Sequence, residues 1–226
     1  MKKLIPIILF ALVLVAGCDN SSENAGEAAH DLTLDGQIVN WQAGNSYYIS
    51  YTIKDPSDRG DDPPIAASKS SISGDGSFSL KIIFAPDSIY LKNIDPFILS
   101  DSYQLRENIN SDSVIITPSD AKVAEAFLYA ARNGEKAYNL GGMRNVNNGD
   151  TLQVRFIYSD RTVSIHGKGI IEAERGRPEY NFYYAINLEK GWNRVGTRQE
   201  ADYKYYITNI DKGKCLAIPY SSWGKR

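Results

Sequence analysis

This chain contains few of the residues that build metal centres or disulfide frameworks. Its 226 residues include two histidines, two cysteines and two methionines. A zinc or iron centre draws three or four ligands from His, Cys and carboxylate side chains, and two cysteines allow at most one disulfide bond. We therefore expect no cofactor and no transition-metal site, and a fold that depends on its hydrophobic core.

An excess of positive charge is also missing. Lys and Arg total 25 and Asp and Glu total 27, so the formal net charge is -2. A nucleic-acid-binding protein uses a basic stripe to neutralise phosphates, and this balance argues against a nucleic-acid partner. Hydrophobic residues make up 42% of the chain, which is enough for a packed core and excludes a wholly disordered protein.

The chain has one long apolar run, and it lies at the N-terminus. Residues 4–16 carry no charge and directly follow Lys2 and Lys3. A helix needs about 20 apolar residues to cross a bilayer, and this run has 13. A positive start followed by a short apolar segment is typical of a signal peptide, so we expect residues 1–17 to be cleaved off.

The end of this run resembles the lipobox of bacterial lipoproteins. In Val15-Ala16-Gly17-Cys18 an aliphatic residue and two small residues precede a cysteine. The resemblance implies that the Cys18 sulfur receives a diacylglycerol, that the chain is cut before Cys18, and that the new amino terminus is acylated, for example with palmitate. Two or three acyl chains hold a protein stably on a membrane. An ordinary signal peptide with an incidental cysteine is the alternative.

Residues 18–31 are expected to be a lipidated cysteine followed by a disordered tether. Residues 19–31 contain no large apolar side chain, and a flexible coil of that length reaches roughly 20 Å. After cleavage 23 basic and 27 acidic residues remain, so we do not expect the protein to lie flat on anionic headgroups. Asp19 resembles the signal that keeps some Gram-negative lipoproteins in the inner membrane, and the outer membrane stays an open alternative. In both cases the protein is extracytoplasmic, for example in the periplasm.

From Leu32 onward, apolar and polar residues alternate, which is typical of strands with one buried face. Turn-forming residues separate the alternating runs, as in Gly74-Asp75-Gly76 and Glu189-Lys190-Gly191, where glycine accepts a positive φ. The pattern predicts a mostly-β fold of two small antiparallel β-sandwich units. We place them at residues 32–95 and 119–226, with a connector at 96–118.

Two resemblances accompany this pattern. Gly36-Gln37-Ile38 with Trp41, and residues 75–80, resemble transthyretin-like or carboxypeptidase-regulatory-like modules of secreted proteins. That resemblance implies a sandwich over residues 32–95. Residues 158–167 and 187–193 resemble exported bacterial lipoproteins without an established activity, which implies a fold and no reaction.

Residues 119–132 support two interpretations. Their composition suits a helix, and Thr117-Pro118-Ser119-Asp120 suits a helix start. However, Asn133-Gly134 follows them and is a strong hairpin signal between strand-length runs. Because the surroundings are β, we favour a hairpin and keep the helix as the alternative.

The candidate sites for metal or catalysis are weak. The carboxylates of one proline-flanked loop offer oxygen ligands for calcium, although their spacing is not that of an EF-hand and a solvated acidic loop explains them equally: Asp55, Asp58, Asp61 and Asp62. Ser119 and Lys122 match one motif of penicillin-recognising enzymes, but the partner motifs are missing. His30 and His166 are isolated, and Cys215 lies in an apolar run where we expect a small buried side chain.

Aromatic residues are the most distinctive remaining feature, with 15 tyrosines in the chain. Rows of aromatic side chains on a strand bind sugars or peptides, and more often they form cross-strand pairs within a sheet. The candidate ligand face consists of Tyr180, Phe182, Tyr184, Tyr203 and Tyr205. Trp192 follows the turn at Gly191, and we expect its side chain in the core.

These observations predict a lipid-anchored protein of the cell envelope that acts as a non-catalytic binding or structural module. Its partners are the membrane, through Cys18, and an unknown envelope protein or glycan. The alternative is an envelope hydrolase acting on glycan or peptide. It requires two converging carboxylates, for example Asp160 with Glu172 or Glu174.

Overall fold

The structure is a computed structural model that describes residues 31–39, 41, 46–53, 68–83, 85–95, 109–132, 138–139, 143–147, 150–171, 178–200, 203–210 and 216–219. All regular elements of these residues are strands except one short 3₁₀ turn, η1 (Ser88–Tyr90). The predicted mostly-β fold is therefore confirmed. None of the described residues belongs to a helix long and apolar enough to cross a membrane. The predicted signal peptide and Cys18 lie outside these residues.

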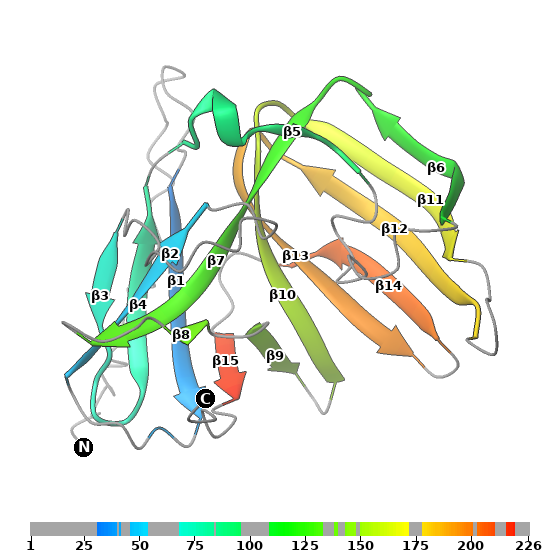
Figure 1. The fold of residues 1–226 in the computed structure, drawn as a ribbon. Helices are drawn as coiled ribbons and strands as arrows, with labels where there is room; N and C mark the ends of the chain where they lie inside the picture. The colour runs from blue at the N-terminus through cyan, green and yellow to red at the C-terminus, as the bar shows by residue number, and fades with distance from the viewer. Residues whose placement is uncertain are drawn as a thin grey trace, which may run out of the picture.

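The described residues form fifteen strands. In chain order they are β1 (Leu32–Val39), β2 (Tyr47–Thr52), β3 (Lys69–Ser71), β4 (Ser77–Ile82), β5 (Lys92–Asn93), β6 (Ile109–Thr117), β7 (Lys122–Arg132), β8 (Tyr138–Asn139), β9 (Met143–Asn147), β10 (Asp150–Ser159), β11 (Val163–Ile171), β12 (Tyr180–Leu188), β13 (Gly191–Glu200), β14 (Lys204–Asn209) and β15 (Leu216–Pro219). One hydrogen-bonded path joins ten of them in the order β4-β1-β15-β9-β10-β13-β14-β12-β11-β6. Figure 1 shows how this path curves from one side of the molecule to the other.

Two strand pairs in this path are parallel, whereas the other pairs of described strands are antiparallel, as expected of a mostly antiparallel β fold. β1 pairs in parallel with β15, and β12 pairs in parallel with β14. β12 and β13 are joined by residues 189–190 alone, yet β14 lies between them. Because β14 runs antiparallel to β13, and β13 turns back from β12, β14 runs in the direction of β12.

Two asparagine side chains bond the main chain at the point where β12 and β13 separate. Asn193 donates from Nδ2 to the Glu189 carbonyl at 2.8 Å and accepts from the Glu189 N–H at 3.0 Å. Asn209, at the end of β14, accepts from the Asn187 N–H at 2.7 Å and donates to the Asn187 carbonyl at 2.8 Å. The amides replace the main-chain bonds that a closed hairpin has at this position.

β7 takes part in two layers: the first is the ten-strand path, which it joins at β10, and the second is a smaller layer with β2, β3 and β8. Its residues 123–126 pair with β10, and its residues 127–132 pair with β2. β3 and β8 complete the second layer, which packs against β1 and β4. Figure 1 shows β7 (green) running diagonally from β2 to β5. The strand confirms the hairpin interpretation of residues 119–132, because β8 folds back antiparallel onto β7.

Main-chain hydrogen bonds cross the predicted boundary between residues 32–95 and 119–226. β15 pairs with residues 36–39 of β1, and β7 pairs with β2. Residues 96–108 of the predicted connector lie outside the described part of the chain. The described strands therefore interleave early and late parts of the sequence within shared sheets.

The first core fills the space between the two layers. Trp192 lies within it with 2% of its surface exposed, and its ring makes T-shaped contacts with Tyr158 at 5.5 Å and Tyr51 at 6.4 Å. The predictions for Trp192 and for a positive φ at Gly191 are confirmed, since Gly191 has φ 102°. The other buried members are Leu32, Leu34, Ile38, Trp41, Ile49, Ile72, Phe78, Leu80, Ile82, Ala124, Ala126, Leu128, Ala130, Val154, Phe156 and Ile210.

The second core lies on the opposite face of β10 and β13. On β10, Phe156 faces the first core and Ile157 faces the second. The described members of the second core are Ile94, Ala121, Val123, Ile157, Val163, Ile165, Ile171, Phe182, Tyr184, Ile186, Leu188, Val195 and Ile207. Residues 154–159 of β10 and 191–196 of β13 are thus buried on both faces, whereas β12 and β14 expose their outer face.

The Gly74-Asp75-Gly76 turn forms as predicted. Gly76 has φ 87°, and a Cβ added there would collide with the Ile38 carbonyl and lie 2.7 Å from the Trp41 Cβ. Asp75 caps the turn, because its Oδ1 accepts from the Ser77 N–H at 3.0 Å and from its hydroxyl at 2.8 Å. The turn requires glycine for both its conformation and its close packing.

Candidate functional site

Four of the five residues of the candidate ligand face form a chain of ring contacts. Phe182 stacks on Tyr205 with centroids 5.0 Å apart, and Tyr205 stacks on Tyr180 at 6.2 Å. Tyr180 then meets Tyr203 in a T-shaped contact at 5.2 Å. We call these four residues the aromatic stack. The parallel pairing of β12 and β14 creates it, because Phe182 and Tyr205 are direct cross-strand partners.

The aromatic stack runs from the core to the surface. Phe182 is buried in the second core, Tyr205 and Tyr180 are half-buried, and Tyr203 is 44% exposed. Tyr184 is buried next to Phe182 in the same core. Of the five residues predicted for a ligand face, only the three tyrosines of the stack have surface that a ligand can touch.

Burial also affects the chemistry of the stack. It raises the pKa of the Tyr205 hydroxyl, and the neighbouring Tyr180 and Tyr203 raise it further. The Tyr205 hydroxyl therefore stays neutral near pH 7 and keeps its proton for donation. The stack offers apolar ring surface together with neutral hydroxyl groups.

Tyr203 has an unusual backbone. Its φ is 60°, and it is the one residue other than glycine with a positive φ among the described residues. Its carbonyl accepts a hydrogen bond from the Asn181 N–H at 3.0 Å, which fixes the turn into β14 beside β12. An aromatic residue in the left-handed region costs about 1–3 kcal/mol, and such residues concentrate at functional sites. Sequence reasoning did not find this feature, because tyrosine carries no preference for that conformation.

The outer face of the same strands is built differently. Tyr183 and Tyr206 stack with centroids 5.0 Å apart. The Lys168 ammonium lies 5.8 Å from the Tyr183 centroid, and the Arg198 guanidinium lies 5.5 Å from that of Tyr206. Each ring is covered on one face by its neighbour and on the other by a cation. This outer row stabilises the sheet and leaves less free ring surface than the aromatic stack.

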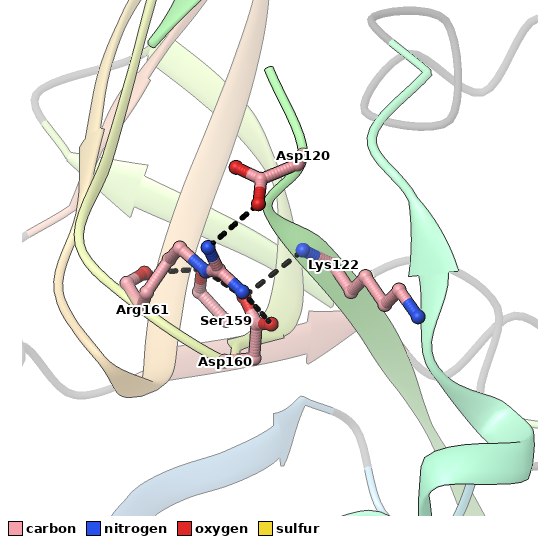
Figure 2. Close-up of polar contacts among 5 residues, drawn as sticks. All are labelled: Asp120, Lys122, Ser159, Asp160 and Arg161. Carbon is pink, nitrogen blue, oxygen red and sulfur yellow. Dashed lines mark hydrogen bonds and ion pairs between the residues drawn. The ribbon is translucent and has the colours of Figure 1, made fainter. Parts of the chain in front are cut away.

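Asp160, the carboxylate proposed for a hydrolase, is held by hydrogen bonds at the turn between β10 and β11 (Figure 2). Its Oδ1 accepts from the Lys122 N–H at 2.9 Å, and Arg161 donates from Nε to Oδ1 at 3.2 Å and from Nη2 to Oδ2 at 3.1 Å. Burial raises the pKa of Asp160, but the Lys122 N–H and Arg161 together lower it below its ordinary value. An ionised carboxylate is unsuited to be a general acid. Its proposed partners, Glu172 and Glu174, lie outside the described residues.

Further hydrogen bonds join the turn before β7 to the turn between β10 and β11. Arg161 also donates from Nη1 to Asp120 Oδ2 at 2.9 Å, and the Asp160 N–H donates to the Lys122 carbonyl at 3.0 Å. The Ser159 hydroxyl donates to the Arg161 carbonyl at 2.6 Å. We call these five residues, which Figure 2 shows, the carboxylate corner. It fixes the start of β7 to the end of β10.

The remaining candidates gain no support from the described residues. Ser119 lies in a turn and Lys122 begins a strand, so the two lack the one-turn helical relationship that their motif requires. His166 is exposed on β11. No group of three or more possible metal ligands occurs among the residues that the structure describes. Outside them lie Cys215 and the calcium candidates Asp55, Asp58, Asp61 and Asp62.

Sequence reasoning also missed a buried ion pair. Arg155 on β10 and Glu125 on β7 are 30 residues apart and interact on the side of the second core. Each was one member of an alternating pattern, and nothing local distinguished it from an exposed charge. Both residues lie within strands beside the point where β7 leaves β10.

Comparison of the chain with protein-family models, curated proteins and solved structures finds no match.

Proposed function

We propose that this protein is a non-catalytic binding protein, anchored to the bacterial cell envelope by lipid at Cys18, that holds a glycan at the exposed end of the aromatic stack. The anchor is argued from the resemblance of Val15-Ala16-Gly17-Cys18 to a lipobox. The observation that carries the binding site is Tyr203, an exposed ring in a left-handed backbone at the end of a stack rooted in the core.

The chemistry of the stack suits a carbohydrate. Sugar rings have apolar faces that pack on aromatic rings and hydroxyls that exchange hydrogen bonds with tyrosine hydroxyls. The neighbouring charges are mixed, since Glu179, Glu200 and Lys204 are all exposed near the ends of β12, β13 and β14. This balance favours a ligand without a strong charge. Stacking on the core also fixes the rings before binding, which lowers the entropy lost on association.

The test is the binding of purified full-length protein to defined neutral and acidic oligosaccharides, measured by isothermal titration calorimetry. Tyr203→Ala removes the exposed ring, and we expect the affinity for a neutral oligosaccharide to fall about tenfold, as for a central aromatic contact. Tyr206→Ala is the matched control, because Tyr206 lies on β14 in the outer row with its faces covered. Its affinity should equal that of the wild type.

A second variant separates binding from folding. Tyr203→Asn removes the ring, while asparagine accepts a positive φ more readily than tyrosine. We expect lost binding at an unchanged melting temperature. An equal loss of affinity in the Tyr203→Ala and Tyr206→Ala variants, or no binding of any oligosaccharide by the wild type, would contradict the proposal.

A further inference from the structure

Exposed apolar side chains gather in one short segment. Among the described residues, the large apolar side chains that are exposed are Ile83, Ile89, Tyr90, Ile115 and Tyr203. Three of these five fall between residues 83 and 90, where the chain leaves β4 and passes through η1. We call Ile83, Ile89 and Tyr90 the apolar tip. Ile89 is the most exposed of all, at 78%.

The apolar tip belongs to an ordered part of the chain. The Tyr90 N–H donates to the Asp87 carbonyl at 2.9 Å, and the Leu91 N–H donates to the Ser88 carbonyl at 3.2 Å. Leu91 packs against the first core, and β5 directly after it pairs with β7. No residue of η1 is buried. Hydrogen bonds and the packing of Leu91 thus fix the backbone of this segment. Its apolar side chains nevertheless face solvent, and exposure of a group of apolar side chains to water is unfavourable unless a partner covers them.

The apolar tip lies beside the start of β1. β1 begins at Leu32, whose cross-strand partner is Ile82, the last residue of β4. Ile83 follows immediately. In Figure 1 the short coil of η1 lies at the top of the molecule, at the end where β1 (blue) begins. Only 13 residues, 19–31, separate this end from Cys18.

We propose that the apolar tip rests on the lipid bilayer to which Cys18 is anchored, an inference that depends on the lipid anchor of the proposed function. A segment of 13 residues spans at most about 45 Å, so the anchor keeps this end of the molecule close to the lipid. Isoleucine side chains favour the acyl boundary, and tyrosine favours the interface between acyl chains and headgroups.

The contact is apolar rather than electrostatic. The charged residues that are exposed at this end nearly cancel: Asp31, Asp87, Asp95, Lys81 and Lys92. Attraction to anionic lipid requires several basic residues without opposing acids. We therefore expect the tip to contact bilayers of uncharged lipid and of anionic lipid equally.

The contact also sets the orientation of the proposed ligand site. Figure 1 shows β12 and β14 beginning at the end of the molecule away from η1. Tyr180 and Tyr203 lie at those strand starts. With the tip on the membrane, the exposed end of the aromatic stack faces away from the lipid.

The experiment measures whether residue 89 enters the lipid. Full-length, acylated protein with Ile89→Cys in a Cys215→Ala background is labelled with a nitroxide and reconstituted into phosphatidylcholine vesicles. Power-saturation electron paramagnetic resonance then compares collisions with oxygen, which concentrates in lipid, and with a nickel complex, which stays in water. Ile115→Cys is the matched control, because Ile115 is another strongly exposed isoleucine, on β6.

We expect the label at position 89 to collide several-fold less with nickel, and more with oxygen, than the label at position 115. Circular dichroism of both variants checks the fold, and Ile83→Cys provides a second position in the tip. Equal nickel accessibility at 89 and 115 in protein that sediments with the vesicles overturns the tip contact alone. Protein that fails to sediment with them overturns the anchor and the contact together. Dipolar broadening between labels at 89 indicates a second copy of the chain and also overturns the lipid contact.

Discussion

Arg155 holds both carboxylate oxygens of Glu125 across the strand pair β10–β7. Its Nε lies 2.6 Å from Oε1 and its Nη2 lies 2.5 Å from Oε2, and the two side chains are 6% and 10% exposed. The pair lies beside residue 126, after which β7 leaves β10 and joins β2. A bidentate charge pair at this position fixes the register in which the shared strand leaves one layer for the other.

Removal of one member of this pair should destabilise the protein strongly. Glu125→Leu leaves the buried Arg155 without its carboxylate partner, and breaking a buried pair costs about 3–5 kcal/mol. We expect a large fall in the urea midpoint. The double variant Glu125→Leu with Arg155→Leu removes both charges and should recover much of the loss. A loss of stability in the double variant equal to the sum of the losses in Glu125→Leu and Arg155→Leu alone would show that the pair itself contributes little.

The carboxylate corner should make the free energy of unfolding depend on pH between the folded and unfolded pKa of Asp160. Because the pKa of Asp160 is lower in the folded protein than in the unfolded chain, its stabilising effect is present above its ordinary pKa of about 3.9 and is lost as pH falls through the folded pKa. We expect Asp160→Asn to lower the urea midpoint at pH 7. The difference from the wild type should shrink steadily below about pH 4.

Asp120→Asn is the matched control for this effect. Asp120 also bonds Arg161, but its side chain is 72% exposed, and exposed ion pairs contribute little. The urea midpoint should therefore hardly change. A wild-type advantage over Asp160→Asn that persists unchanged at pH 2 would contradict the assignment.

Trp192 should be essential for folding. Its ring fills the first core between Tyr51 and Tyr158, and truncation of a buried aromatic side chain costs about 3–5 kcal/mol. That is a large part of the 5–15 kcal/mol typical of a domain, so Trp192→Ala should accumulate as poorly folded or degraded protein. Urea denaturation measures the effect, with Tyr206→Ala as a partly exposed aromatic control. Equal midpoints for the Trp192→Ala variant and the wild type would refute the core assignment.

The proposed lipid anchor makes Cys18 the residue on which membrane attachment should depend. Cys18→Ser removes the sulfur that receives the lipid, so we expect soluble protein or an uncleaved precursor in cell fractions. Ala16→Ser keeps a small residue before the cleavage site and should be processed normally. Recovery of normally cleaved, membrane-bound Cys18→Ser protein would exclude the lipid anchor.

The sequence predicted features that depend on neighbouring residues. Alternation identified the strands, and glycine-rich turns predicted the positive φ of Gly76 and Gly191. The position of Trp192 after its turn predicted its burial. Each inference required only the local periodicity and the conformational limits of individual residue types.

Features that depend on distant pairing were not predictable in this way. Alternation shows which face of a strand is buried, but it does not show what covers that face. It therefore placed Phe182 and Tyr203 in one candidate face, although one is in the core and the other is at the surface. The bond from the Lys122 N–H to Asp160 joins residues 38 positions apart, and no local pattern reveals it.

The sharing of β7 and β10 has a consequence for how the protein unfolds. β7 contributes to both layers, and β10 is covered by one core on each face. Both cores depend on β7 and β10. Unfolding of one core would expose apolar residues on these strands and would therefore also destabilise the other core. Heat or urea should therefore melt the two cores in one cooperative transition, and neither half of the chain should survive alone as a folded fragment.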